Sequence, residues 1–189
     1  GLAAIQMARN AGCTVFATAG SEKKLALLSE FGVQHPINYQ AQDFEREVLR
    51  IAGGPKIDVV LDSVGGNYFK KDLNLLRPHG RVVAFGAAAF SERNLFKLPA
   101  LLPQVISMLT LSMIDLMLHS KGFYGVNMLR VAKENPDLLQ YELQEVMKQF
   151  AAKKLKTVVS RQMSWRQIGE AHETLENRSS TGKIVLMVD

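Results

Sequence analysis

Residues 1–24 read GLAAIQMARNAGCTVFATAGSEKK and set out the beginning of an α/β fold. Apolar residues at helical spacing predict a helix over residues 2–11, and Gly12 stands where a glycine cap would end it. The run TVFATA (14–19) has the apolar character of a buried strand. Ser21 then has the position of an N-cap for a second helix. This order of elements is typical of the repeating unit of a parallel sheet.

The rest of the chain continues the alternation. We expect strands at 35–39, 56–64, 81–86, 121–128 and 182–188, a turn at 77–80, and helices at 43–52, 65–76, 98–118, 136–152 and 164–177. Short apolar runs between helices of about ten residues imply right-handed crossovers and a parallel sheet covered on both faces. The predicted fold class is α/β, a Rossmann, doubly wound, mostly parallel sheet with helices on both faces, in one domain over residues 1–189.

Composition excludes several classes of protein. Of the 189 residues, 47% are hydrophobic and 22% are charged, which is normal for a globular domain with a full core. The single cysteine, Cys13, rules out an internal disulfide framework and agrees with a reducing compartment, so we expect a cytoplasmic protein. The net charge is +5, and the sequence has no stripe of lysine and arginine interleaved with aromatic residues. No nucleic-acid partner is therefore expected. No cysteine and histidine cluster has metal-ligand spacing.

The stretch LPALLPQVISMLTLSMIDLML (98–118) invites a membrane interpretation. Pro99, Pro103, Gln104 and Asp115 interrupt it, so its continuous apolar length falls short of the roughly 20 residues that a bilayer span needs. We therefore favour a buried or interface helix over membrane association.

The residues that follow the strands carry the chemistry, because ligands of open parallel sheets lie beyond the carboxyl ends of the strands. After strand 14–19, Gly20, Ser21 and Lys24 combine a helix N-terminus, a hydroxyl and an ammonium group, which together suit an anion. NAD-binding folds place a carboxylate here for the ribose 2′-OH, whereas Glu22 lies one residue inside the helix. This pattern favours a 2′-phosphate and hence NADP(H). An ordinary capped helix with solvated lysines is the alternative.

Small residues come at the ends of two further strands. Ser63, Val64, Gly65 and Gly66 come after KIDVVLD (56–62), and Gly86 and Ala87 come after RVVAF (81–85), which lets a flat ligand lie close to the backbone. A helix that begins at Gly1 looks like the first helix of a Rossmann unit, with this glycine ending a phosphate-binding turn and packing closely on the sheet. Since the preceding strand is absent from the sequence, we expect a fragment that lacks the first strand of its sheet.

Together these motifs resemble the carboxy-terminal half of the medium-chain dehydrogenase/reductases, in particular the zinc-independent NADPH:quinone oxidoreductase branch. The matching motifs are Gly1 with Gln6 and Arg9, ATAGSEKK (17–24), GVQHPINY (32–39), IDVVLDSVGG (57–66), LLRPHGRVVAFG (75–86) and TGKIVLMV (181–188). Within this branch, the HPINY stretch and the apolar 98–118 segment are most similar to the VAT-1-like proteins.

The resemblance implies an NADP(H) site, no zinc, and a homodimer paired across the segment 122–124. It assigns Ser21 and Lys24 to the 2′-phosphate and places Tyr39 by the adenosine phosphate. The full set of cofactor residues is Gly1, Gly20, Ser21, Lys24, Tyr39, Ser63, Val64, Phe85, Gly86, Ala87, Gly122, Phe123 and Lys183. In this family an amino-terminal, GroES-like catalytic domain precedes such a domain, and the closing segment is expected to return toward it.

The activity implied by the resemblance is hydride transfer from NADPH to a quinone or an enone. No catalytic residue is assigned, because a strand tyrosine such as Tyr124 is more often a packing residue. Two alternatives stay open: an NADPH-binding, VAT-1-like module for lipid, membrane or protein interaction, and a related alcohol dehydrogenase or enoyl reductase. Because exposed strand edges invite association, we expect the segment alone to be poorly stable and inactive.

Overall fold

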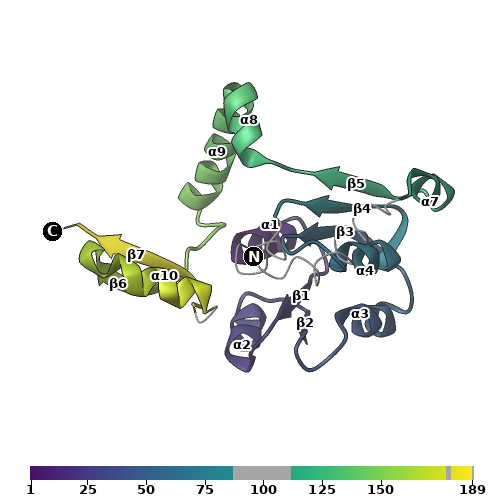
Figure 1. Cartoon of the computed structure of the whole chain (residues 1–189), viewed down its shortest axis with the longest axis horizontal. Coiled ribbons are helices and arrows are strands. Elements are labelled where there is room, and N and C mark those ends of the chain that lie inside the picture. Colours follow the sequence, from purple (N-terminus) through teal and green to yellow (C-terminus); the bar gives the residue numbers. More distant parts are fainter. Residues whose placement is uncertain (87–111, 178–179, 189) are drawn as a thin grey trace, which may run out of the picture. The chain divides into compact units, whose positions relative to one another are not determined.

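The computed structural model describes residues 1–86, 112–177 and 180–188, in which helices and strands alternate along the chain (Figure 1). The chain forms two compact units, one of Gly1–Gln42 with Tyr141–Asp189 and the other of Asp43–Gln140. Each strand pair formed by the described residues is parallel, and helices alternate with the strands. The predicted α/β, Rossmann-type fold is confirmed.

The first unit begins with two helices and two strands around a small apolar core. β1 and β2 pair in parallel, and α2 packs on both strands. The buried side chains of this core are Ile5, Ala19, Leu28 and Val33. The elements are α1 (Leu2–Asn10), β1 (Phe16–Ala19), α2 (Glu22–Glu30) and β2 (His35–Asn38).

The closing part of the chain adds a second parallel pair to this unit. The side chain of Gln6 in α1 contacts it: Nε2 donates to the carbonyl oxygen of Lys156 at 3.0 Å, and Oε1 accepts from the Lys156 N–H at 2.8 Å. One side-chain amide therefore joins backbone 150 positions away. The elements are α9 (Pro136–Ala151), β6 (Val159–Ser164), a 3-10 turn at Trp165–Gln167, α10 (Ile168–Glu176) and β7 (Lys183–Met187).

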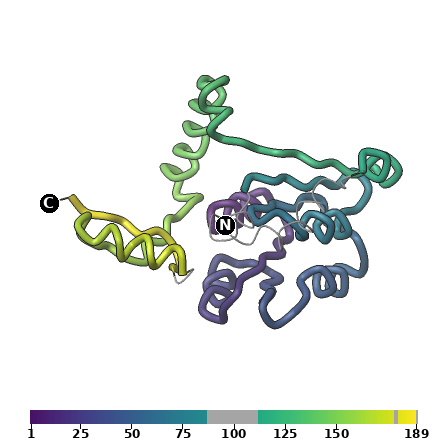
Figure 2. The backbone as a smooth tube through the Cα atoms, viewed as in Figure 1, coloured from purple at the N-terminus to yellow at the C-terminus, as the bar shows by residue number. Residues whose placement is uncertain are grey.

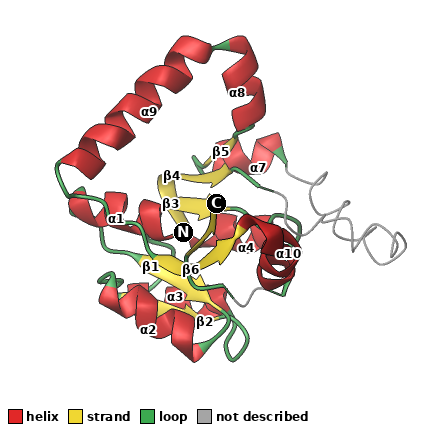
Figure 3. Cartoon of the chain, turned by 90° about the vertical axis from the view of Figure 1, so that its left-hand side faces the viewer, coloured by secondary structure: helices red, strands yellow, loops and turns green. Residues whose placement is uncertain are grey.

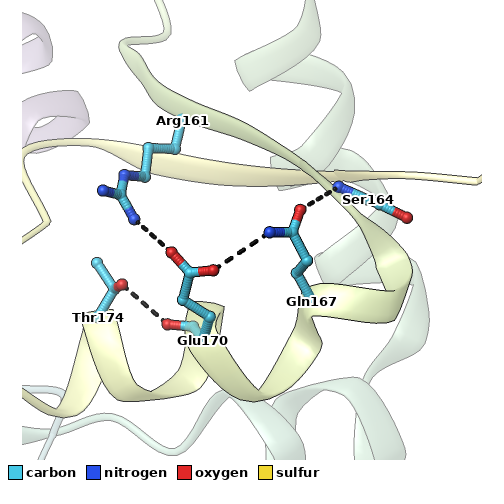
Figure 4. A network of polar contacts seen from close by, with 5 residues as sticks. All are labelled: Arg161, Ser164, Gln167, Glu170 and Thr174. Carbon is cyan, nitrogen blue, oxygen red and sulfur yellow. Dashed lines mark hydrogen bonds and ion pairs between the residues drawn. The ribbon is translucent and has the colours of Figure 1, made fainter.

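A polar network fixes the turn from β6 into α10 (Figure 4). Gln167 accepts from the Ser164 N–H through Oε1 and donates to Glu170 through Nε2. The other carboxylate oxygen of Glu170 accepts from Arg161 of β6 at 3.1 Å. Ser164 and Gln167 thus form a capping box, which satisfies two backbone donors where the predicted helix begins.

The second unit contains a three-stranded parallel sheet in the order β3-β4-β5 (Figure 3). Helix α4 packs on β3 and β4, and α3 packs on α4. Figure 2 shows the backbone continuing from β5 through α8 into α9. The elements are α3 (Phe44–Ala52), β3 (Ile57–Asp62), α4 (Tyr68–Leu75), β4 (Leu76–Ala84), α7 (Met113–Leu118), β5 (Gly122–Gly125) and α8 (Met128–Glu134).

Strand β4 differs from the sequence prediction. The expected turn at 77–80 lies inside this strand, whose register against β3 shifts between the pairs Ile57–Leu76 and Val59–Arg81. His79 has a φ of 66°, and its N–H donates to the carbonyl oxygen of Ser120 at 2.6 Å. The turn-forming residues therefore make an irregularity within an extended strand rather than a break before it.

Apolar exposure also departs from the prediction. On β3, Val59 and Leu61 are 45% and 51% exposed, so the described part of this unit covers that face of the strand incompletely. Of the predicted 98–118 helix, residues 98–111 lie outside the described residues and α7 forms the end. Only Leu116 of α7 is buried, so this end of the segment is mostly exposed, and the buried or interface helix stays a prediction. Nowhere in 1–86, 112–177 or 180–188 does a helix have the length and apolarity of a bilayer span.

Candidate cofactor-binding site

The N-terminus of α2 lies at the end of β1 and begins at a serine whose side chain does not cap the helix. Ser21 is the N-cap residue in an extended conformation (φ −155°, ψ 151°), and its side chain makes no capping hydrogen bond. Its exposed hydroxyl is therefore available to a ligand. The first N–H groups of a helix have no intrahelical carbonyl to bond, and the helix dipole favours negative charge there. This arrangement suits an anionic group.

Gly20 lets the Tyr39 side chain approach the same strand end. A Cβ atom at Gly20 would lie 2.6 Å from the Tyr39 Oη and 2.8 Å from its Cζ, closer than atoms can pack. The Tyr39 N–H donates to the carbonyl oxygen of Ala19 at 3.1 Å, which continues the β1–β2 pairing by one residue. The structure thus brings together Gly20, Ser21 and Tyr39, three of the predicted site residues.

A carboxylate also lies at this end of the first unit. Glu22, the first residue of α2, accepts a hydrogen bond from the side-chain amide of Asn38 at 3.0 Å. Asn38 ends β2, and its Oδ1 accepts from the Gln40 N–H. Sequence reasoning placed Glu22 inside the helix and missed its contact with the end of β2. Its position next to Ser21 was the signal that could have revealed it.

In the second unit, the loop after β3 is shaped by the carboxylate of Asp62. This buried side chain accepts from the N–H of Val64 at 2.6 Å and from the N–H of Gly65 at 3.1 and 3.2 Å. Gly65 and Gly66 follow with φ of 77° and 66°, backbone angles that residues other than glycine rarely adopt. An aspartate that bonds backbone two residues on is a frequent turn former, so the DSVGG stretch could have shown this role for Asp62.

The end of β4 lies against this loop. The N–H of Phe85 donates to the carbonyl oxygen of Asp62 at 3.0 Å, and a Cβ at Gly86 would meet the carbonyl oxygen of Ser63 at 2.7 Å. The structure therefore brings together Ser63, Val64, Phe85 and Gly86 of the predicted set. Ala87 lies outside the described residues.

Four predicted residues are not brought to these strand ends. Gly122 and Phe123 begin β5 opposite Arg81 and Val82, and the Phe123 ring packs edge-to-face on Phe69 with centroids 5.0 Å apart. The carboxyl end of β5 is instead at Gly125 and Val126, beside Ala84.

Gly1 and Lys183 complete this group. No atom lies within 4 Å of a Cβ built at Gly1, so the described residues show no close packing there. Lys183 begins β7, and its side chain is exposed. The cofactor contacts proposed for all four residues stay predictions.

Comparison with known proteins then identifies the family. The family model described as zinc-binding dehydrogenase matches residues 1–142. The chain belongs to this dehydrogenase family. Zinc-binding dehydrogenases of this kind are medium-chain dehydrogenase/reductases, as the sequence motifs predicted.

Three similar proteins show the range of this dehydrogenase family. The zebrafish (Danio rerio) synaptic vesicle membrane protein VAT-1 homolog is 33% identical over all of this chain and 39% of its own length. A 2-haloacrylate reductase of a Burkholderia species is 41% identical over 45% of this chain and 26% of its own. The crystal structure of a Pseudomonas syringae quinone oxidoreductase is 27% identical with a TM-score of 0.75, over 99% of this chain and 53% of that one. The chain therefore spans about half or less of the length of these relatives.

The observed strand ends fit the nicotinamide cofactor that this dehydrogenase domain binds. In the first unit, the N-terminus of α2 suits an anion. In the second unit, taken by itself, the close approach of Gly86 to Ser63 leaves backbone at the strand end. Within the described part of the chain, no group of three or more His, Cys, Asp or Glu side chains could hold a metal ion.

Proposed function

We propose that this chain binds NADPH and forms the cofactor-binding part of an oxidoreductase that reduces a quinone or an enone. The observation that carries the proposal is the N-terminus of α2. There the Ser21 hydroxyl makes no cap hydrogen bond, and the carboxylate of the next residue, Glu22, is hydrogen-bonded to Asn38. A 2′-phosphate would accept from the hydroxyl, the first helix amides and the Lys24 ammonium group.

The chain's own residues bind and orient the cofactor in this proposal. In the first unit, Ser21 and Lys24 bind the phosphate and Tyr39 packs at the adenosine side. In the second unit, the loop held by Asp62 and the end of β4 at Gly86 offer backbone to the ribose and the nicotinamide side. A bound nicotinamide supplies the hydride, so the protein contributes position and electrostatics. None of these residues is proposed as a general acid.

The names of two relatives support a conjugated acceptor. One is a 2-haloacrylate reductase, whose named substrate carries a carbon–carbon double bond next to a carboxylate, and the other is a quinone oxidoreductase. We therefore propose an electron-poor, conjugated acceptor over an alcohol. The test compares the rates at which NADPH reduces a quinone and 2-haloacrylate with the rate at which NADP⁺ oxidises simple alcohols. Faster reduction of the conjugated acceptors supports this function, and faster alcohol oxidation supports an alcohol dehydrogenase.

The binding proposal is tested by titrating the full chain with NADPH and with NADH. Lys24→Ala is expected to weaken NADPH binding by about 1.5–3 kcal/mol, the contribution of a hydrogen bond to a charged group, and to leave NADH binding nearly unchanged. Lys23→Ala is the matched control, because Lys23 is an exposed neighbour on the same helix turn. Equal losses for the two variants, or equal affinity for both nucleotides, would refute the phosphate site.

A second candidate function is an interaction module, favoured by the apolar surface of α7. Met113, Ile114, Met117 and Leu118 are each 69% or more exposed, an unusual density for a six-residue helix. The similarity to a synaptic vesicle membrane protein agrees with such a role. Sedimentation of the full chain with phosphatidylserine vesicles tests it, and loss of sedimentation in Met117→Glu would support it.

We also propose a homodimer paired across β5, in a cytoplasmic protein. Within the described residues, β5 is an edge strand that pairs only with β4. The Val126 N–H donates to Ala84 of β4, so the N–H of Gly125, one residue earlier, faces the free edge. Gly125→Pro removes this edge donor, and analytical ultracentrifugation of this variant is expected to show a monomer.

A further inference from the structure

Two carboxyl groups lie together inside the second unit. Asp62 ends β3 and is 6% exposed, and Asp72, on α4, is 4% exposed. Beyond the effect of burial, Asp62 raises the pKa of Asp72 through its charge and through a side-chain hydrogen bond, so the two carboxyl groups interact. The Asp62 carboxylate already accepts from the Val64 and Gly65 amides, whereas Oδ2 of Asp72 has no hydrogen-bond partner. Asp72 therefore contacts the group that shapes the loop but takes no part in the loop hydrogen bonds itself.

Among the described residues, no positive charge on the neighbouring elements compensates this pair. Lys71, next to Asp72 on α4, forms an ion pair with Asp43 at the start of α3. Lys121, just before β5, donates to the carbonyl oxygen of Leu73, and Arg77 at the start of β4 pairs with Asp58 of β3. The other described charged groups near α4 also add no positive charge to the pair.

Glu45 of α3 faces Asp72 with a further negative charge, and its side chain accepts from Asn74. On β4, His79 and Arg81 are exposed to solvent. Two buried carboxylates in contact, without a cation, cannot both be ionised at low cost. One of the pair must hold a proton, and Asp62 is the one that the loop amides stabilise as a carboxylate.

Burial raises the pKa of Asp72 to about 8, and the charge of Asp62 and then its hydrogen bond add to the effect. At neutral pH the Asp72 carboxyl is therefore mostly protonated and can donate to Asp62. This makes Asp72 the donor and Asp62 the acceptor in the pair.

We propose that Asp72 is a positioning residue whose protonated carboxyl donates to Asp62 and so holds the Ser63–Gly66 loop in the shape that faces the cofactor. Ionisation of Asp72 places two carboxylates in contact, and their repulsion pushes Asp62 away from the Val64 and Gly65 amides. The loop then loosens as the pH rises through the range in which Asp72 loses its proton. The cofactor side of this inference rests on the proposed function, but the state of the loop does not.

Amide hydrogen exchange of the full chain tests the inference without any cofactor. We expect the protection of Val64 and Gly65, corrected for the intrinsic rate, to fall about tenfold or more between about pH 6 and pH 9. In Asp72→Asn the side-chain amide is a permanent donor of the same shape, so protection should stay high and independent of pH. The Arg46 amide, which donates to Asp43 elsewhere in this unit, is the internal control and should not change in this range.

Two results would overturn the inference. One is constant protection of Val64 and Gly65 in the natural chain over the whole pH range. The other is an Asp72→Asn chain that is folded but has an unprotected loop. If that variant does not fold, the pH profile of the natural chain decides alone.

NADPH titrations at the same pH values separate this inference from the proposed function. Affinity should weaken at high pH in the natural chain and not in Asp72→Asn. If NADPH does not bind at any pH, the proposed function fails, while the exchange result still stands or falls by itself.

Discussion

Gly86 shows how a single missing Cβ atom sets the approach of two strand ends. A Cβ there would lie 2.7 Å from the backbone oxygen of Ser63, which cannot rotate away as a side chain can. We expect Gly86→Ala to lower the free energy of unfolding by about 1–3 kcal/mol, the usual cost of overpacking. Gly125→Ala is the control, because a Cβ at Gly125 in the same unit meets no atom within 4 Å. Urea denaturation measures both, and equal effects would contradict the contact.

Gly20 and Tyr39 form a second such contact, which a double-mutant cycle can isolate. Gly20→Ala forces the Tyr39 ring away from the end of β1, so we expect lower stability and weaker NADPH binding. In a Tyr39→Ala background the same substitution meets no ring and should cost much less. The predicted coupling between the two sites is about 0.5–3 kcal/mol. Additive losses in the urea midpoints would show that the two residues do not interact.

Which residues the sequence could reveal depends on whether their role leaves a local pattern. Gly12 stands after a periodic apolar run and follows its helix with a positive φ, as a glycine cap does. Ser21 was found as an N-cap by position, although its side chain makes no capping bond. Asp72 left no such pattern. A charged residue on an amphipathic helix predicts solvent exposure, whereas α4 packs on β3, β4 and α3 and Asp72 is buried.

At the scale of an element, α3 depends on Asp43. Its side chain accepts from the Arg46 N–H as an N-cap and pairs with Lys71, whose hydrogen bond is the main cause of its lowered pKa. We expect Asp43→Ala to destabilise the chain by about 0.5–2 kcal/mol, as lost caps do. Asp43→Asn should keep the cap and lose only the exposed ion pair, at a smaller cost. Chemical denaturation of both variants measures the difference.

The pH dependence of this contribution has a defined sign. The pKa of Asp43 is lower in the folded chain than its ordinary value of 3.8, so the stabilisation is present above that pH and is lost as the pH falls through the folded value. Asp72 acts in the opposite direction, since its pKa is raised. Its contribution is full below about pH 4 and is lost as the pH rises through about 8. Denaturation curves that show no loss at either end would contradict these assignments.

Elements with a clear apolar period were predicted well, and those without one were missed. β6 reads VSRQMS, in which polar residues interrupt the apolar pattern, so neither strand nor helix periodicity stands out. α8 was hidden by the strand prediction for 121–128, although the Asn127 side chain caps it by accepting from Leu129 and Arg130. β4 was shortened because Pro78 and Gly80 indicate a turn, whereas pairing with β3 keeps the chain extended. In each case a tertiary contact overrode the local signal.

At the scale of the whole molecule, ligand binding should appear as stability. A ligand that binds only the folded state stabilises it by about 2.7 kcal/mol when present at about a hundred times its Kd. We therefore expect NADPH to raise the melting temperature of the full chain more than NADH does at equal concentration. Lys24→Ala should reduce the NADPH shift and leave the NADH shift nearly unchanged. Equal shifts by both nucleotides, measured by calorimetry, would argue against discrimination at the 2′-position.

The alternation of elements and the order of motifs were enough to predict the parallel α/β fold and the family. Both patterns extend over nearly the whole sequence. The cofactor's phosphate and the acceptor depend on a few atoms at strand ends, and these are proposals that binding must test. The central proposal is that the N-terminus of α2 holds the 2′-phosphate of NADPH.

Amide hydrogen exchange at Glu22, Lys23 and Lys24 tests it most directly, with the full chain saturated in turn with NADPH and NADH. We predict strong slowing of these amides by NADPH and weaker slowing by NADH, because only NADPH places a 2′-phosphate against the helix N-terminus. Slowing that is equal for both nucleotides, or absent while NADPH is bound, would contradict it.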